Sequence, residues 1–370
     1  MKGLLVWAQS ACRSQMALYR ELGKALGVPV DVAIWYYKAD PAEIDNREAV
    51  GFRADEFDDM KVSPVGESWE KGLEFLDAHP GWHHLFCNYQ QSANYRRLQL
   101  EAARRGDRTA IGGESPCNMS VGWRRVAKEI YYHTRLPLMV KDNIRVSDFF
   151  VNYSGLDDRN ARAIGWPRDK IMPFGYFPPP LPGTKCVKRT DNRPFEILIT
   201  GEMTWHRGID VAVEGLVRLK HMGIPFHATI TQRGSLLEKM KARVLAESVP
   251  ADFVGLLAMS ELHKAYETCS VYVGAGRHEP WGMRLNDALN CGAPLVVSRG
   301  MGGVKIVDDF RCGLAFRNED PQDLADKLAK LATDDAVYSE CAKNVMKAIA
   351  GCSPKARACE LAEIMNRRWA

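Results

Sequence analysis

Short apolar runs alternate with longer amphipathic stretches along most of this chain. The apolar runs have the length of strands, and the stretches between them have the composition and length of helices. Strands are predicted at residues 4–7, 30–35, 83–87, 109–111 and 149–153, and helices at residues 13–26, 67–77, 95–105, 123–133 and 156–164. Strands that alternate with helices predict a parallel β-sheet with helices on both of its faces.

The alternation is interrupted at two places. Residues 40–63 are polar and acidic and predict a long loop. Residues 176–183 are rich in proline, which fits neither a helix interior nor a central strand, so residues 179–193 are predicted to be a linker. The alternation resumes at residues 196–201 and 226–231. The chain is therefore predicted to form one α/β domain over residues 1–178 and a second over residues 194–352.

Composition narrows the class of protein. The chain has 370 residues and a formal net charge of +4, which does not suggest a nucleic-acid partner. Its ten cysteines include no CxxC pair and no Cys/His cluster, so we expect buried thiols in a reducing compartment and no metal. No segment approaches the roughly 20 apolar residues of a membrane-spanning helix. We expect a cytoplasmic protein. The basic, aromatic segments 95–105 and 123–135 fit either a peripheral membrane contact or a solvated helix face.

The most informative stretch is residues 279–298. A strand-like run at 270–273 and a small-residue turn at 274–276 precede it, and Gly282 is predicted to open a helix that stops near Gly292. A second apolar run then follows Pro294. Backbone N–H groups at the start of such a helix have no partner within the helix, and together with the helix dipole they suit a phosphate group.

Two acids flank this helix start. Glu279 lies in the loop, and Asp287 shares a helix face with Met283 and Arg284 by its spacing. Acids on either side of a phosphate site fit the hydroxyl groups of a nucleotide sugar. An ordinary helix start with a solvated Asp287 explains the same spacing, and the spacing alone does not separate the two readings.

The stretch resembles a motif of retaining glycosyltransferases of the GT-B fold, in glycosyltransferase family 4. Residues 279–282 read Glu-Pro-Trp-Gly, where the family has Glu-Pro-Phe-Gly, and residues 292–298 match its Gly-x-Pro-apolar-apolar-x-Ser tail. The second acid of the family motif is Glu, and this chain has Asp287. The resemblance implies two Rossmann-like α/β domains with parallel sheets facing a central cleft, and a last helix, residues 355–370, that packs back on the first domain.

The resemblance extends to the donor side of the second domain. Residues 207–210 match the family's Lys-Gly-x-Asp with Arg207 in place of Lys, which implies that Arg207 binds the donor diphosphate. Glu202 stands where the family has Arg, so Arg284 or Arg233 would compensate, or the donor is held differently. Gly255 and Leu256 resemble the family strand end that lies near the nucleobase.

Candidates for binding the acceptor lie in the first half of the chain, where predicted strands end. The carboxyl ends of parallel strands are the usual ligand edge of such a sheet. Asn88, Gln90 and Gln91 follow one strand, and Glu114 follows the next. A polar turn explains any one of these residues equally well.

The resemblance implies a glycosyltransferase of the hexosyltransferase type (EC 2.4) that acts in polysaccharide or glycoconjugate biosynthesis. It would move sugar from a nucleoside-diphosphate sugar to a glycan, lipid-linked or small-molecule acceptor, with retention. Glu279 would orient the sugar, Asp287 the ribose, and the N–H groups of Gly282, Met283 and Arg284 the diphosphate. The chain has no Asp-x-Asp, so neither metal nor other cofactor is expected. A nucleotide-sugar epimerase or hydrolase, or a non-catalytic nucleotide- or glycan-binding protein on the same scaffold, remains an alternative.

Overall fold

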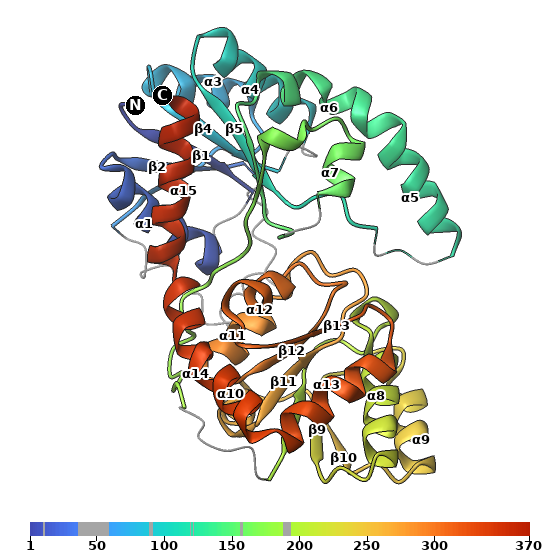
Figure 1. Cartoon of the computed structure of the whole chain (residues 1–370). Helices are drawn as coiled ribbons and strands as arrows, with labels where there is room; N and C mark the ends of the chain where they lie inside the picture. Colours follow the sequence, from blue (N-terminus) through green and yellow to red (C-terminus); the bar gives the residue numbers. More distant parts are fainter. Residues whose placement is uncertain are drawn as a thin grey trace. The chain divides into compact units, whose positions relative to one another are not determined.

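The computed structural model describes residues 1–9, 12–35, 59–88, 92–118, 120, 122–155, 158–187 and 194–370. It divides into two compact units (Figure 1). Unit 1 comprises Met1–Pro179 and Ser353–Ala370, and unit 2 comprises Pro180–Cys352. The last helix of the chain thus belongs to the first unit, together with the amino-terminal half.

Unit 1 is built on a seven-stranded parallel sheet with the order β3-β2-β1-β4-β5-β6-β7. The strands are β1 Leu4–Ala8, β2 Val30–Ile34, β3 Lys61–Pro64, β4 His83–Cys87, β5 Thr109–Gly113, β6 Phe150–Asn152 and β7 Ile171–Pro173. The helices are α1 Arg13–Leu26, α3 Trp69–Ala78, α4 Ala93–Arg104, α5 Trp123–His133, α6 Arg135–Val146, α7 Arg159–Ala163, the 3₁₀ turn Arg168–Lys170 and α15 Pro354–Trp369.

One expectation for this half was wrong. The polar stretch predicted as a loop over residues 40–63 ends in strand β3, which pairs in parallel with β2. Strand β3 lies at the sheet edge and is largely exposed, so its sequence carries no apolar run. Lys61 instead binds Asp31 of β2 through an ion pair of 2.8 Å. Residues 40–58 lie outside the described part of the chain.

Aromatic side chains fill the core of unit 1 and join the sheet to its helices. Trp7 of β1 stacks on Phe86 of β4, with ring centroids 5.5 Å apart. Tyr95 of α4 donates its hydroxyl proton to the carbonyl oxygen of Trp7 at 2.7 Å. At the end of the chain α15 packs against α1, and the guanidinium of Arg357 lies 4.6 Å from the ring centre of Phe177. These contacts hold the last helix to unit 1.

Unit 2 is built on a six-stranded parallel sheet with the order β10-β9-β8-β11-β12-β13. The strands are β8 Glu196–Ile199, β9 His227–Thr231, β10 Ala251–Gly255, β11 Val271–Gly274, β12 Leu295–Ser298 and β13 Gly313–Phe316. The helices are the 3₁₀ turn η3 Trp205–Arg207, α8 Ile209–His221, α9 Leu237–Ala246, α10 Met259–Thr268, α11 Arg284–Asn290, α12 Val304–Phe310, α13 Pro321–Thr333 and α14 Asp335–Gly351.

The strand order of unit 2 reverses between β8 and β11. Strands β8, β9 and β10 follow one another outward on one side, and β11, β12 and β13 follow outward on the other. The loops that leave β8 and β11 therefore diverge to opposite faces, and a crevice opens between them at the carboxyl ends of the strands. In open parallel sheets this switch point is where ligands bind.

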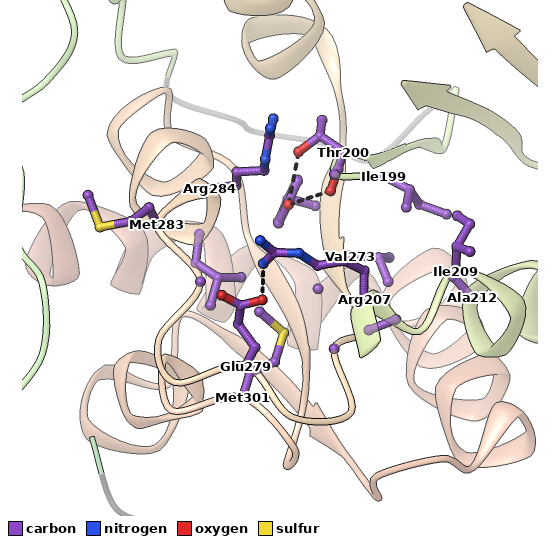
Figure 2. A pocket seen from close by; sticks show the side chains of 17 residues that line it. Ile199, Thr200, Arg207, Ile209, Ala212, Val273, Glu279, Met283, Arg284 and Met301 are labelled. Carbon is purple, nitrogen blue, oxygen red and sulfur yellow. Dashed lines mark hydrogen bonds and ion pairs between the residues drawn. The ribbon is translucent and has the colours of Figure 1, made fainter. Parts of the chain in front are cut away.

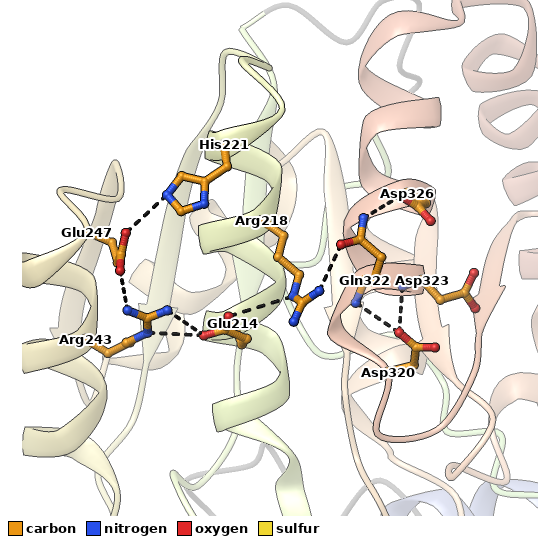
Figure 3. A network of polar contacts seen from close by, with 9 residues as sticks. All are labelled: Glu214, Arg218, His221, Arg243, Glu247, Asp320, Gln322, Asp323 and Asp326. Atoms are coloured by element: carbon orange, nitrogen blue, oxygen red, sulfur yellow. Dashed lines mark hydrogen bonds and ion pairs between the residues drawn. The ribbon is translucent and has the colours of Figure 1, made fainter.

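A polar network covers the outer side of α8 (Figure 3). Arg243 of α9 donates to Glu214 of α8 at 3.0 Å and also binds Glu247. On the other side Arg218 of α8 donates to Gln322 of α13 at 2.9 Å. These side chains are partly exposed, so each pair contributes little to the stability of unit 2.

We expect packing, and not this network, to set the stability of unit 2. A Cβ atom at Gly313 of β13 would overlap the backbone carbonyl oxygen of Leu295 in β12. Gly313→Ala should therefore lower the free energy of unfolding by about 3 kcal/mol or more, because backbone cannot move aside. Arg243→Ala should lower the free energy of unfolding by less than about 1 kcal/mol, although it removes several ion pairs. Urea unfolding of both variants, followed by circular dichroism, checks this order, and a larger loss in Arg243→Ala would contradict it.

Candidate functional site

A cavity of about 150 Å³ lies at the switch point between β8 and β11 (Figure 2). The end of β8 and the end of β11 form its floor, and η3, the start of α8, the loop after β11 and the start of α11 form its walls. Its lining consists of Ile199, Thr200, Gly201, Arg207, Ile209, Ala212, Tyr272, Val273, Gly274, Ala275, Gly276, Glu279, Gly282, Met283, Arg284, Leu285 and Met301. The cavity lies wholly within unit 2.

An ion pair between Arg207 and Glu279 crosses this cavity (Figure 2). Burial lowers the pKa of the Arg207 guanidinium, and the neighbouring charge of Arg284 acts in the same direction. Arginine stays protonated despite such a shift. The buried Nε of Arg207 has no hydrogen-bond partner among the described residues. The cavity thus holds two cations and one acid, and one of its N–H donors is available.

Two glycines allow the cavity walls to come this close. Gly208 links η3 to α8 with φ of +67°, and a Cβ atom there would overlap the carbonyl oxygen of Ala275. Gly282 has φ of +94°, and a Cβ atom there would overlap the side chain of Met301. Both positions require the left-handed backbone that glycine adopts without strain.

The expected start of the helix at Gly282 was wrong. Helix α11 begins at Arg284, with Met283 as its N-cap, because the positive φ of Gly282 is incompatible with a right-handed helix. None of the described side chains caps this helix start. The helix has seven residues, so its dipole is short, and the positive potential of the cavity comes mainly from Arg207 and Arg284.

Five of the residues predicted on the donor side come together in this cavity. They are Arg207, Glu279, Gly282, Met283 and Arg284. The other four do not line it and are Arg233, Gly255, Leu256 and Asp287.

The four remaining positions and Glu202 lie outside the lining. Burial raises the pKa values of Tyr266 and Tyr272, and the charge of nearby Asp287 acts in the same direction. Arg233 is exposed and Gly255 ends the edge strand β10, with exposed Leu256 after it. Glu202 is exposed and lies outside the lining, but its negative charge still acts on the Arg207 guanidinium and opposes the effect of burial on the pKa of that group.

Thr200 and Tyr272 are parts of the site that the sequence did not reveal. The hydroxyl of Thr200, just after β8, lies 3.0 Å from that of Tyr272 on β11 and 3.2 Å from that of Tyr266. This contact joins the two strands at the switch point. Thr200 carries no signal in the sequence beyond its place at the end of an apolar run.

Arg277 is a third residue that sequence reasoning missed. Only 6% of it is exposed, and its guanidinium donates to both carboxylate oxygens of Asp210 at 2.7 and 2.8 Å. It also donates to Glu319 at 2.7 Å and to the carbonyl oxygen of Trp205 at 2.7 Å. Arg277 therefore ties the loop that carries Glu279 to the turn that carries Arg207. The one sign of Arg277 in the sequence was a single arginine in a loop of small residues.

The acceptor candidates lie at the carboxyl edge of the sheet in unit 1. Asn88 follows β4 with φ of +69° and donates its backbone N–H to Gly112 at 2.6 Å. Glu114 follows β5 and is exposed. Desolvation raises the pKa of its carboxyl, and a hydrogen bond from Tyr176 opposes this shift. Gln90 and Gln91 lie outside the described residues.

The contact between Arg277 and Asp210 leads to a prediction on acid stability. Desolvation raises the pKa of the Asp210 carboxyl, but the hydrogen bonds and charge of Arg277 more than offset this and hold it below its usual range. A depressed pKa stabilises the fold above the unfolded-state value of about 3.9, and this stabilisation is lost as the pH falls through the folded-state value.

Asp210→Asn should therefore lower the free energy of unfolding by about 1–3 kcal/mol at neutral pH. The difference from the unaltered protein should shrink below about pH 4. Asp308→Asn is the matched control, because Asp308 accepts a hydrogen bond from the exposed Arg299 at 3.2 Å. This substitution should lower the free energy of unfolding by less than about 1 kcal/mol. Urea titrations at a series of pH values check this, and a difference that does not depend on pH would contradict it.

Known proteins share both the fold and part of the sequence. The chain is 32% identical over 108 residues to sucrose-phosphate synthase 4 of Arabidopsis thaliana, a match that spans 26% of this chain and 10% of that synthase. HepE of Anabaena, crystallised with UDP, superposes with a TM-score of 0.65 at 12% identity over 99% of this chain and 100% of HepE. The lipopolysaccharide outer core galactosyltransferase WaaB superposes with a TM-score of 0.66 at 11% identity, over 99% of this chain and 100% of WaaB.

The two superpositions show the fold of the whole chain, which is GT-B, as the sequence predicted. The match to a family model lies in the second half, where the cavity lies. Residues 185–348 match the family model described as glycosyl transferases group 1. Unit 2, which holds Arg207 and Glu279 in its cavity, thus contains the stretch that matches the group 1 glycosyl transferase model, within a chain of GT-B fold.

Proposed function

We propose that this protein is a retaining glycosyltransferase that takes its sugar from a nucleoside-diphosphate sugar. The proposal rests on the ion pair between Arg207 and Glu279, which faces Arg284 in a cavity at the switch point of unit 2. The group 1 family match of the same unit supports it, as does the UDP bound by HepE, a protein of the same fold. The acceptor is a glycan, a lipid-linked sugar or a small molecule.

The donor diphosphate binds between Arg207 and Arg284. A phosphate oxygen competes with the Glu279 carboxylate for the Arg207 guanidinium and accepts a hydrogen bond from the Nε that lacks a partner among the described residues. Glu279, released from Arg207, accepts hydrogen bonds from hydroxyl groups of the sugar. Binding thus exchanges one charge-assisted contact for two.

The size of the cavity supports binding of one part of the donor within it. Its volume of about 150 Å³ lies below the roughly 300–1,000 Å³ of pockets that enclose a whole drug-sized ligand. The diphosphate and the sugar occupy it, and the nucleoside extends beyond it. The ribose role of Asp287, the base contacts of Gly255 and Leu256 and a phosphate contact of Arg233 remain predictions for that outer part.

Catalysis follows from the fixed cations. As the bond between the anomeric carbon and the phosphate oxygen breaks, negative charge grows on the leaving diphosphate, and Arg207 and Arg284 stabilise it. The acceptor oxygen attacks from the face that the phosphate leaves, and its proton passes to a phosphate oxygen. A new C–O bond forms on the same face, so the configuration is retained. No step in this scheme requires a metal ion.

Two substitutions test the assigned roles. Arg207→Ala should weaken UDP binding by about 10–100-fold, since a hydrogen bond to a charged group contributes about 1.5–3 kcal/mol. Glu279→Gln should keep or strengthen UDP binding, because it frees Arg207, but should abolish sugar transfer. Calorimetric titration with UDP, GDP, ADP, CDP and dTDP measures the first effect, and product analysis with the matching sugar nucleotide measures the second.

Arg243→Ala is the control for both assays, since Arg243 is a partly exposed arginine of the same unit outside the cavity. Near-normal transfer by Glu279→Gln would remove the role assigned to Glu279. Consumption of the donor at the same rate without any acceptor would indicate a hydrolase. Absence of affinity for every nucleotide would indicate a non-catalytic protein.

Metal independence is tested separately. Initial rates of transfer should be unchanged when EDTA is added and when Mg²⁺ or Mn²⁺ is supplied in excess, because Arg207 and Arg284 supply the positive charge. A rate that is lost with EDTA and restored by Mn²⁺ alone would contradict this part of the proposal.

A further inference from the structure

Helix α5 of unit 1 has its apolar side facing solvent. All of its residues are described, and none is buried. Trp123, Val126 and Ile130 are 76%, 60% and 59% exposed and share one helix face through their i, i+3 and i+7 spacing. In Figure 1 α5 lies at the outer end of unit 1, next to α6 and away from the sheet. Three large apolar side chains on one exposed helix face require an explanation.

The carboxyl-terminal half of the same helix contacts the protein through another side. Glu129 accepts a hydrogen bond from the side-chain amide of Asn118 at 2.7 Å, and that amide also donates to the carbonyl oxygen of Arg125 at 2.8 Å. Tyr131 and Tyr132 pack against the core of unit 1. These contacts fix the rotation of α5 about its axis, so the exposure of its apolar face is a property of the fold.

Exposed cations occupy the other sides of this helix, where the helical spacing places Arg124, Arg125 and Lys128. Arg124, Arg125, Lys128 and Arg135 are exposed, and the one acid of the helix, Glu129, is engaged by Asn118. The guanidinium of Arg124 lies 5.8 Å from the ring centre of Trp123. A second copy of this chain on the same face would bring like charges together, which disfavours a symmetric contact.

We propose that α5 binds the surface of a membrane that contains anionic lipids. Trp123, Val126 and Ile130 insert at the level of the headgroups, and the long cationic side chains on the polar sides of the helix reach lipid phosphates. Tryptophan favours this interface because its ring is apolar and its N–H is polar. Within the described residues no helix is long and apolar enough to cross a bilayer, so the contact is peripheral. The proposal does not depend on the reaction proposed for unit 2.

Vesicle flotation with the full chain tests this contact. The protein should float with vesicles of phosphatidylcholine and phosphatidylglycerol in equal parts, and far less with phosphatidylcholine alone. High salt should release it, because salt screens exposed charges. Two variants, the pair Trp123→Ser with Ile130→Ser and the pair Arg124→Glu with Lys128→Glu, should each lower the bound fraction about ten-fold.

Two control variants test whether flotation depends on α5 itself or on any exposed apolar residue or cation of the protein. Leu245→Ser removes an apolar side chain of unit 2 that is also exposed, and Arg145→Glu reverses an exposed cation on α6. Both should float as the unaltered protein does. Circular dichroism melts should be the same for all variants, since only exposed side chains change.

Several outcomes would overturn the proposal. These are absence of flotation with anionic vesicles, equal flotation with neutral vesicles, and unchanged flotation of both α5 variants. A further one is self-association of the free protein, seen by light scattering, that Trp123→Ser with Ile130→Ser abolishes, because a second copy would then cover this face.

Discussion

The geometry of the candidate site depends on the buried guanidinium of Arg277. A charge removed from water is tolerated only when its donors are satisfied, and here two carboxylates and a backbone carbonyl accept from it. Those acceptors belong to the turn before α8, to α8 itself and to the loop after β13. Because the same arginine is two residues from Glu279, its contacts fix the distance between the acid and Arg207. The catalytic proposal therefore rests on an interaction that never touches the donor.

The sheet order gives this cluster its place. Strands β8 and β11 are neighbours in unit 2 although β9 and β10 separate them in the chain. Their loops leave in opposite directions, and their pairing brings the hydroxyl groups of Thr200 and Tyr272 to 3.0 Å from each other. Gly208 and Gly282 then let the two walls approach more closely than side chains would permit. The strand order thus determines where the cavity lies, and the two glycines determine how narrow it is.

Buried elements were readable from the sequence, and exposed or strained ones were not. All or nearly all residues of strands β1 and β4 are buried, so both strands could be predicted from their apolar runs. Strand β3 lies at an edge and is held partly by Lys61, so it has no such run. The true start of α11 depends on the positive φ of Gly282, which a sequence does not encode directly. Arg277 was missed because its partner Asp210 lies 67 positions earlier.

The pairing of Arg207 with Glu279 has a consequence for which anions enter the site. In the empty protein the acid already neutralises the guanidinium, so a chloride ion or a single inorganic phosphate gains little by displacing it. A ligand gains more when it brings phosphate for the arginine and hydroxyl groups for the carboxylate at the same time. The closed ion pair thus acts as a filter that favours molecules carrying both kinds of group over the abundant simple anions of a cell.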